Sequence, residues 1–163
     1  MAFSIFNQNK LTMDKLEQLI NDDIKQAMLA KDAQRLSALR AVKAAIMLEK
    51  TSGSSHELSD ADVLKIMQKL VKQRTESAQI YREAGRDELA ASEDAEAAVI
   101  QTYLPRKMTP DELEAELRNI IAQVGAKSPA EMGKVMGVAS KQLAGKADGK
   151  QISEIVKKLL ANA

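Results

Sequence analysis

The stretch SDADVLKIMQKLVKQRTESAQIYREAG, from Ser59 to Gly85, decides the fold class. It opens with Ser59 followed three residues later by Asp62, an arrangement that caps the start of a helix. Apolar side chains then recur at helical spacing along one face, and Gly85 is suited to end the segment. The positions on that face are Val63, Met67, Leu70, Ala78 and Tyr81. The pattern predicts a long amphipathic helix.

The same periodicity extends in both directions from this helix. Two apolar runs precede it, Leu16, Leu19, Ile20, Met28 and then Leu36, Leu39, Val42, Ile46. They predict two helices that join near Lys31, with Asp32 able to cap the second. A fourth helix is expected from Asp87, which can cap it, toward Tyr103. Leu104-Pro105 should stop it, because proline disfavours helix in the residue before it.

Three helix starts of one design follow Pro105: TPDE at Thr109, SPAE at Ser128 and DGKQ at Asp148. Each has a capping residue with Glu or Gln three positions later. The three apolar faces are Leu113, Leu117, Ile120, Val124, then Met132, Val135, Ala139, Leu143, and then Ile152, Ile155, Val156, Leu159. Short helices are unstable alone, so these three must pack together.

Composition supports an all-α fold, with an N-terminal bundle of about four helices followed by a C-terminal three-helix domain. The chain has only four aromatic residues and eight Met among its 163 residues, so its core must be aliphatic. We expect a flexible leader at residues 1–12, an N-terminal domain at 13–105 and a C-terminal domain at 106–163.

The sequence offers no residues for several kinds of site. It contains no Cys, and its single His56 lies in a small polar segment, where a solvated linker residue is the simplest interpretation. We therefore expect no metal site, no cofactor and no catalytic constellation. No signal-peptide pattern or membrane-length apolar run is present, which favours a cytoplasmic protein without a membrane partner.

Charge divides unevenly along the chain, although the net charge is only +1. Residues 1–105 carry 14 Lys and Arg against 16 Asp and Glu, and residues 106–163 carry 10 against 7. The C-terminal part is therefore the basic one.

The stretch MGKVMGVASKQLAGKADGK, from Met132 to Lys150, concentrates glycine and lysine. On a helical wheel a strip with little side-chain bulk forms from Gly133, Gly137, Ser140 and Ala144. Lys134 and Lys141 flank the strip, so a polyanion could approach the helix backbone between two ammonium groups. The alternative is that another helix packs on the strip.

The end of this stretch predicts a turn. Gly145 is suited to a left-handed helix cap, and Gly149 begins the next helix between Lys146 and Lys150. Free backbone N–H groups beside lysines are typical of a phosphate-binding helix start. Asp148 as a plain cap with solvated lysines is the competing interpretation.

Arg74 falls on the apolar face of its helix and therefore needs partners. Glu93 and Glu96 on the next helix are the candidates, and a structural ion pair is favoured over a binding site. The stripe of Lys65, Lys69 and Lys72 is on the opposite side and is interpreted as a solvated face.

Several separated segments resemble the GatB/YqeY family, specifically its free-standing YqeY-like proteins. These are KQRTES (Lys72 to Ser77), EAGRDEL (Glu83 to Leu89), Glu93 with Glu96, TYLP (Thr102 to Pro105), MGKVMG (Met132 to Gly137) and GKADGK (Gly145 to Lys150). The resemblance runs from Met13 to the C-terminus. The C-terminal half also resembles the tail of the GatB subunit of glutamine-dependent amidotransferases, which amidate Asp-tRNA or Glu-tRNA.

The resemblance implies a role near tRNA and translation, because the family places that helical tail on tRNA. Gly133 with Met136, and Gly145, Lys146 and Ala147, match its characteristic elements, with about one extra helical turn between them here. We expect a tRNA-directed RNA-binding accessory protein, non-catalytic by itself, whose partners are RNA and a tRNA-modifying or aminoacylation enzyme.

Two alternatives remain open. One is an activity associated with carbon–nitrogen ligases that use glutamine as amido-N-donor, the enzyme label that the family attracts. The other is a helical protein-interaction module.

Overall fold

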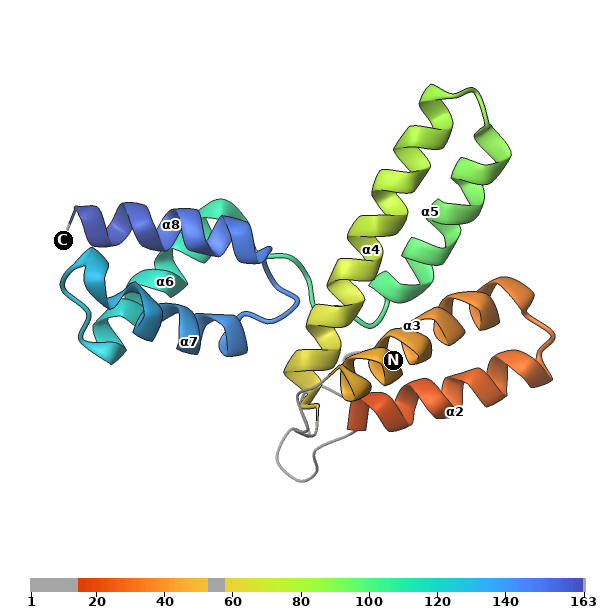
Figure 1. Ribbon diagram of the computed structural model, residues 1–163, viewed down its shortest axis with the longest axis horizontal. Coiled ribbons are helices and arrows are strands. Elements are labelled where there is room, and N and C mark those ends of the chain that lie inside the picture. The colour runs from red at the N-terminus through yellow and green to blue at the C-terminus, as the bar shows by residue number, and fades with distance from the viewer. Residues whose placement is uncertain (1–14, 53–57, 163) are drawn as a thin grey trace. The chain divides into compact units, whose positions relative to one another are not determined.

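The computed structural model describes residues 15–52 and 58–162, and most of them lie in helices (Figure 1). No strand occurs among these residues, which confirms the predicted all-α fold. His56 and the predicted leader at residues 1–12 lie outside the described residues. The elements are α2 (Lys15–Leu29), α3 (Ala33–Thr51), α4 (Asp60–Glu83), α5 (Asp87–Gln101), α6 (Pro110–Val124), the 3-10 turn η1 (Pro129–Glu131), α7 (Met132–Gln142) and α8 (Gly149–Ala161).

Two compact units divide the chain, the first ending at Leu104 and the second beginning at Pro105. The first unit holds α2 to α5 and the second holds α6 to α8, which is the predicted four-plus-three arrangement. No helix in the described part of the chain combines the length and apolar character needed to cross a membrane.

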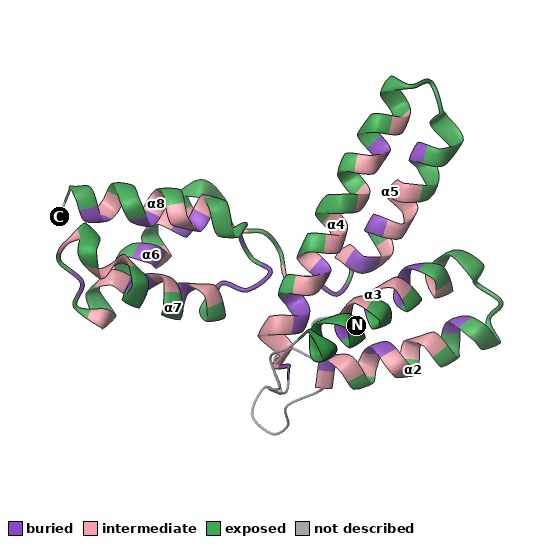
Figure 2. Ribbon diagram, in the orientation of Figure 1, coloured by how far each residue is buried: buried purple, intermediate pink, exposed green. Residues whose placement is uncertain are grey.

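The first unit consists of two helical hairpins. Helix α2 packs along α3 and α4 packs along α5, while α3 joins the hairpins through its contacts with α5 and α4 (Figure 1). Buried residues recur along each of the four helices (Figure 2). The largest fully buried ones are Ile20, Leu39, Val42, Ile46, Val63, Met67 and Ile100.

The helix starts and ends follow local chemistry. Ser59 and Asp62 form the predicted capping box at the start of α4, and the Asp32 side chain accepts a bond from the Arg35 N–H at the start of α3. Gly85 has φ +72°, a left-handed conformation suited to glycine, and it follows the end of α4.

Two local predictions in the first unit were wrong. Asp87 is not the cap of α5 but its first residue, and Arg86 occupies the cap position. The Arg86 N–H donates a hydrogen bond to the Tyr81 carbonyl, which closes the turn between α4 and α5. Met28 was placed on the apolar face of α2, yet it is 53% exposed, while Ala27 is fully buried. The small Ala side chain faces the interior at the end of the helix, and Met28 is turned outward.

The second unit has its own aliphatic core. Side chains from all three helices meet there, and they are Leu113, Leu117, Ile120, Val135, Ala139, Leu143, Ile152, Val156 and Leu160. Thr109 caps α6 through a bond from the Glu112 N–H. The Met108 N–H donates to the Lys146 carbonyl at 2.9 Å, so the segment before α6 is tied to the turn before α8.

Candidate functional site

One face of α7 is open to solvent and forms a shallow groove. We call it the α7 groove, and its lining residues are Gly133, Lys134, Gly137, Val138, Lys141 and Gln142. A Cβ atom placed on Gly133 or Gly137 would meet no atom within 4 Å. No element of the described chain therefore packs on these two glycines. Sequence reasoning missed Val138 and Gln142, although each directly follows a residue predicted for this face.

The open glycine surface is shorter than the predicted four-residue strip. Ser140 is half-buried, and Ala144 is buried at 8% exposure. The helix ends at Gln142, and the chain then turns Leu143 into the core. Ala144 therefore leaves the helical line that the wheel assumed, and the open strip reduces to Gly133 and Gly137.

The two lysines of the α7 groove differ in their surroundings. Lys134 Nζ lies 3.8 Å from Glu131 Oε1, one turn earlier in the chain. Lys141 makes no ion pair with any residue that the structure describes. The two residues are separated by about two helical turns, or roughly 10 Å along the axis. A ligand on this face would meet one partly neutralised and one unpaired ammonium group.

The Glu131 carboxylate has a structural role as well. It accepts hydrogen bonds from the backbone N–H groups of Lys127 at 2.6 Å and Ser128 at 3.2 Å. These bonds, with the nearby charges of Lys134 and Lys127, lower the pKa of Glu131 below its ordinary value of 4.5. The carboxylate therefore fixes the chain at the entry to η1 and α7.

The turn between α7 and α8 uses much of its backbone for folding. Gly145 is buried and has φ +77°. The Lys146 N–H donates to the Leu143 carbonyl at 3.0 Å, so this N–H is not free as the sequence suggested. The side chain of Lys146 remains exposed. Gly145 shapes the turn, and Lys146 offers its ammonium group.

Gly149 and Lys150 begin α8, and both are exposed. Asp148 precedes them at the predicted cap position, but its side chain makes no cap hydrogen bond to the start of α8. A Cβ on Gly149 would meet open space. The segment from Met132 to Asn162 carries a surplus of positive charge, because it contains six lysines and only two carboxylates. The lysines are Lys134, Lys141, Lys146, Lys150, Lys157 and Lys158, and the carboxylates are Asp148 and Glu154.

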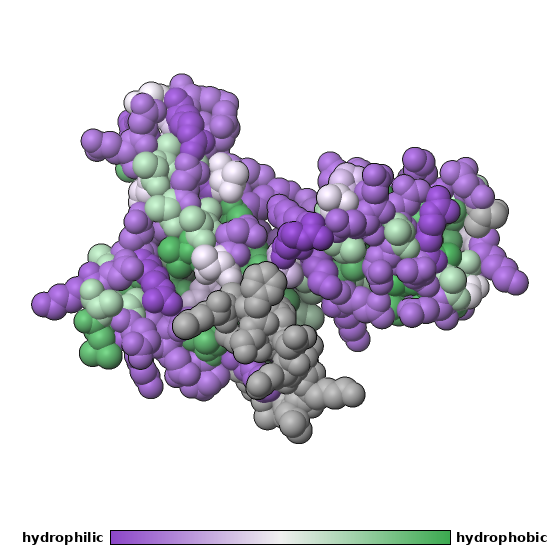
Figure 3. Space-filling model, turned by 180° about the vertical axis from the view of Figure 1, so that it is seen from behind, coloured by the Kyte–Doolittle hydropathy of each residue, from purple (hydrophilic) through white to green (hydrophobic). Residues whose placement is uncertain are grey.

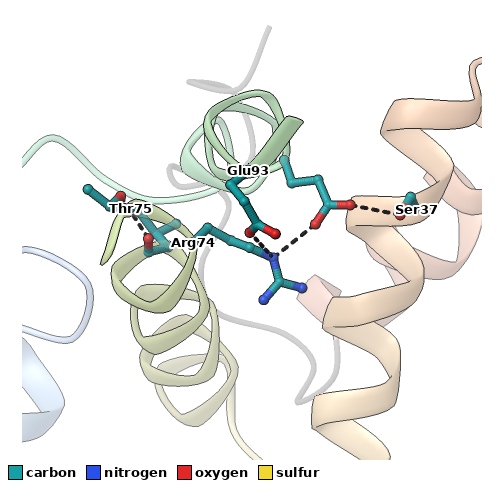
Figure 4. A network of polar contacts seen from close by, with 6 residues as sticks. Ser37, Arg74, Thr75 and Glu93 are labelled. Carbon is teal, nitrogen blue, oxygen red and sulfur yellow. Dashed lines mark hydrogen bonds and ion pairs between the residues drawn. The ribbon is translucent and has the colours of Figure 1, made fainter. Parts of the chain in front are cut away.

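The structure brings Arg74 together with both of its predicted partners (Figure 4). Arg74 Nε lies 2.9 Å from Glu96 Oε2 and 3.8 Å from Glu93 Oε2. Ser37 Oγ on α3 donates to Glu96 Oε1 at 2.8 Å. The cluster therefore links α3, α4 and α5. The Arg74 side chain is 22% exposed, so it is less buried than its position on the wheel suggested.

A second polar cluster joins α2 and α3 to the segment after α5. The Tyr103 hydroxyl donates to Asp23 Oδ2, and Arg35 Nη2 lies 3.6 Å from the same oxygen. Burial and the bond to Asp23 raise the pKa of Tyr103 to about 12. Sequence reasoning did not find this cluster. Among the residues that the structure describes, no three His, Cys, Asp or Glu side chains gather where they could hold a metal ion.

Several relatives in yeasts carry the name "Altered inheritance of mitochondria protein 41, mitochondrial". The relative from Meyerozyma guilliermondii is 33% identical over 119 residues, which are 71% of this chain and 62% of the relative. The relative from Vanderwaltozyma polyspora is 29% identical over 104 residues, or 63% of this chain and 56% of the relative. The matched region therefore spans less than two thirds of each of these proteins.

The family comparison covers far more of the chain than either relative. The family model described as "Yqey-like protein" matches residues 17–160, so the match includes both compact units, the α7 groove and the Arg74 cluster. This chain belongs to the YqeY-like (GatB/YqeY) family.

Proposed function

We propose that this protein is a tRNA-directed RNA-binding accessory protein that is non-catalytic by itself. The observation that carries the proposal is the open glycine and lysine face of α7, where no described side chain covers Gly133 or Gly137. A phosphate backbone needs close approach and positive charge, and this face offers both. The resemblance of the C-terminal half to the tRNA-binding GatB tail points to tRNA.

Seven of the eight residues predicted for RNA binding are exposed, and they form the proposed contact surface. These are Gly133, Lys134, Gly137, Lys141, Lys146, Gly149 and Lys150. Gly145 contributes by shaping the turn. Few aromatic side chains are present, so stacking on single-stranded bases is a poor mode, and the shape of a folded RNA is the better target.

The test is the salt dependence of binding to a fluorescent tRNA, measured by anisotropy. Changing Lys134, Lys141, Lys146 and Lys150 to Gln should weaken binding. The slope of log affinity against log salt should become shallower by about 0.7 to 0.9 for each phosphate that is no longer neutralised by a lysine. A single strand of the same length should bind less tightly than the folded tRNA.

A matched variant controls for net charge. Changing Lys25, Lys43, Lys65 and Lys69 to Gln removes the same number of exposed lysines from the first unit. That variant should retain the affinity and the salt slope of the unchanged protein. Equal losses in both variants would show attraction to net charge alone and would reject the α7 surface.

Steric block gives a second test that leaves charge untouched. Gly137→Leu should fold, because its Cβ enters open space, and it should reduce tRNA affinity by bulk on the groove. Ala122→Leu places the same bulk on an exposed position of α6 and should bind normally. Full affinity in Gly137→Leu would contradict close approach of RNA to α7.

We also propose a cytoplasmic location and a tRNA-modifying or aminoacylation enzyme as partner. Recovery of the tagged protein from fractionated cells, with sequencing of bound RNA and identification of bound proteins, tests both. Enrichment with mitochondria, a compartment that the names of the yeast relatives mention, would reject the cytoplasmic location.

A further inference from the structure

The outer face of α3 combines positive charge with exposed apolar side chains. Arg40, Lys43 and Met47 are spaced by three and four residues and therefore share one face. Met47 is 56% exposed and the neighbouring Leu48 is 71% exposed. In the described part of the chain neither Arg40 nor Lys43 has a carboxylate within ion-pair distance. We call this surface the α3 face.

The last two turns of α4 carry the opposite charge around another exposed apolar side chain. Glu76, Ile80 and Glu83 are spaced by four and three residues, and Ile80 is 65% exposed. Glu83 accepts a hydrogen bond from the Gln79 side chain at 3.0 Å. Neither carboxylate has an ion-pair partner among the described residues. We call this surface the α4 end.

The surroundings of the α4 end are acidic overall. Asp87 and Glu88 occupy the first turn of α5, just after it in the chain. Arg82 forms an ion pair with Asp94. Arg86 is the one other cationic residue within residues 76–88. Figure 3 shows that hydrophobic side chains lie in small groups on a mostly hydrophilic face of the protein.

We propose that the α3 face binds the α4 end of a second copy of this chain. The two surfaces match in kind: the α3 face is basic with an apolar edge, and the α4 end is an apolar side chain between two carboxylates. Docking would pair Arg40 and Lys43 with Glu76 and Glu83 and remove Met47 and Ile80 from water. This inference is independent of RNA binding, since both surfaces belong to the first unit.

The interface has a defined symmetry class. Each copy contributes two different surfaces, so the contact is heterologous and leads to a closed ring or an open chain of copies. Each surface is a small part of one helix, which is typical of weak interfaces. Association should therefore require concentrations of about 0.1 to 1 mM and should weaken as salt screens the charges.

Sedimentation equilibrium of the nuclease-treated full-length protein tests this inference. The average mass should rise with concentration at low salt and should fall toward that of one copy in high salt, at about 1 M. A mass that stays at one copy across the whole range at low salt would overturn the proposal.

Charge reversal tests the assignment of the two surfaces. Arg40→Glu with Lys43→Glu should lower the association constant by roughly tenfold or more, because two attractions become repulsions. Glu76→Lys with Glu83→Lys should do the same. The two variants mixed together, or all four changes in one chain, should restore association.

The matched control is Lys65→Glu with Lys69→Glu, which gives the same net charge as the α3 variant. Both lysines are exposed on α4, toward its start and outside the proposed contact. This control should associate like the unchanged protein. An equal loss in the control, or no recovery on mixing, would overturn the pairing of the α3 face with the α4 end.

A neutral variant separates apolar contact from charge. Met47→Gln with Ile80→Gln keeps every charge and should lower the association constant, since less apolar area is then removed from water. Circular dichroism should show unchanged helix content, because all these positions are exposed. Unchanged association in this variant would contradict the contact as described.

Discussion

At the scale of single residues, Arg74 shows how one charged side chain can join three helices. Its Nε is shared by Glu93 and Glu96, and Glu96 is in turn bonded by Ser37 on α3. A guanidinium that serves two carboxylates holds the α4–α5 hairpin in register and connects it to α3. We infer a structural role for this cluster.

Changing Arg74 to Ala should destabilise the first unit by about 1 to 2 kcal/mol. This is less than the roughly 3 to 5 kcal/mol typical of a fully buried pair, because water reaches 22% of the Arg74 side chain. Urea unfolding followed by circular dichroism measures the change.

The matched control for this prediction is Arg82→Ala. Arg82 pairs with Asp94, but both side chains are nearly half exposed, so the variant should lose less stability. Equal losses of stability in the two variants would show that the Arg74 cluster stabilises the first unit no more than an exposed ion pair does. Loss of tRNA binding by Arg74→Ala without loss of stability would make Arg74 part of a binding site.

Helical spacing was enough to find the partners of Arg74, because all three residues lie on regular helices. It did not find the cluster of Asp23, Arg35 and Tyr103. Tyr103 lies after the end of α5, where periodicity gives no direction, and it is 80 residues from Asp23. Only the packing of α2 and α3 against that segment brings these side chains together.

At the scale of elements, capping chemistry predicted the helix starts better than periodicity predicted the helix ends. Ser59 and Thr109 cap their helices through side-chain hydrogen bonds as expected. Asp148 occupies the cap position of α8 without a side-chain cap bond, and the predicted cap at Asp87 was wrong by one residue. The end of α7 was placed too late, because Leu143 and Ala144 continue its apolar and small-residue pattern on a wheel. Their burial in the core instead required the chain to leave the helix.

Protonation of Glu131, at the start of α7, should make the second unit less stable in acid. Its pKa in the folded state lies below the ordinary value of 4.5, so its contribution is present above that value. The contribution is lost as the pH falls through the lowered pKa. Glu131→Gln should therefore be less stable than the unchanged protein at neutral pH, and the difference should shrink as the pH falls below 4.5 and through the lowered pKa of Glu131.

Thermal unfolding at a series of pH values checks this prediction. Glu154→Gln is the control, since Glu154 is an exposed carboxylate within α8. A difference for Glu131→Gln that stays constant from about pH 7 to about pH 3 would show that its carboxylate charge does not stabilise the fold.

At the scale of the whole molecule, each unit buries its own core. All eleven buried residues of the second core belong to Leu113 through Leu160. The two units divide between Leu104 and Pro105, where the sequence also changes from acidic to basic. The sequence alone could not predict that the α7 groove is uncovered, because a strip of small residues is equally suited to packing against another helix.

A fragment of residues 105–163 should fold on its own. Its three helices share one aliphatic core, although so small a domain should be only marginally stable. The fragment should give a cooperative thermal transition and bind tRNA with the salt slope of the full chain. A non-cooperative transition would show that the second unit needs the first.

The two uncovered glycines of α7 also affect how the second unit fluctuates. Each glycine costs a helix about 1 kcal/mol relative to alanine, and α7 has only 11 residues in which to absorb two of them. A Cβ placed on either glycine would have no neighbouring atom within 4 Å, so the backbone at these two positions is open to solvent. Amide hydrogens of α7 should therefore exchange with solvent deuterium faster than those of α6 and α8, by local opening that leaves the rest of the unit folded. If tRNA binds the α7 groove as proposed, it should slow that exchange, so isotope uptake along α7 would report occupancy of the groove directly.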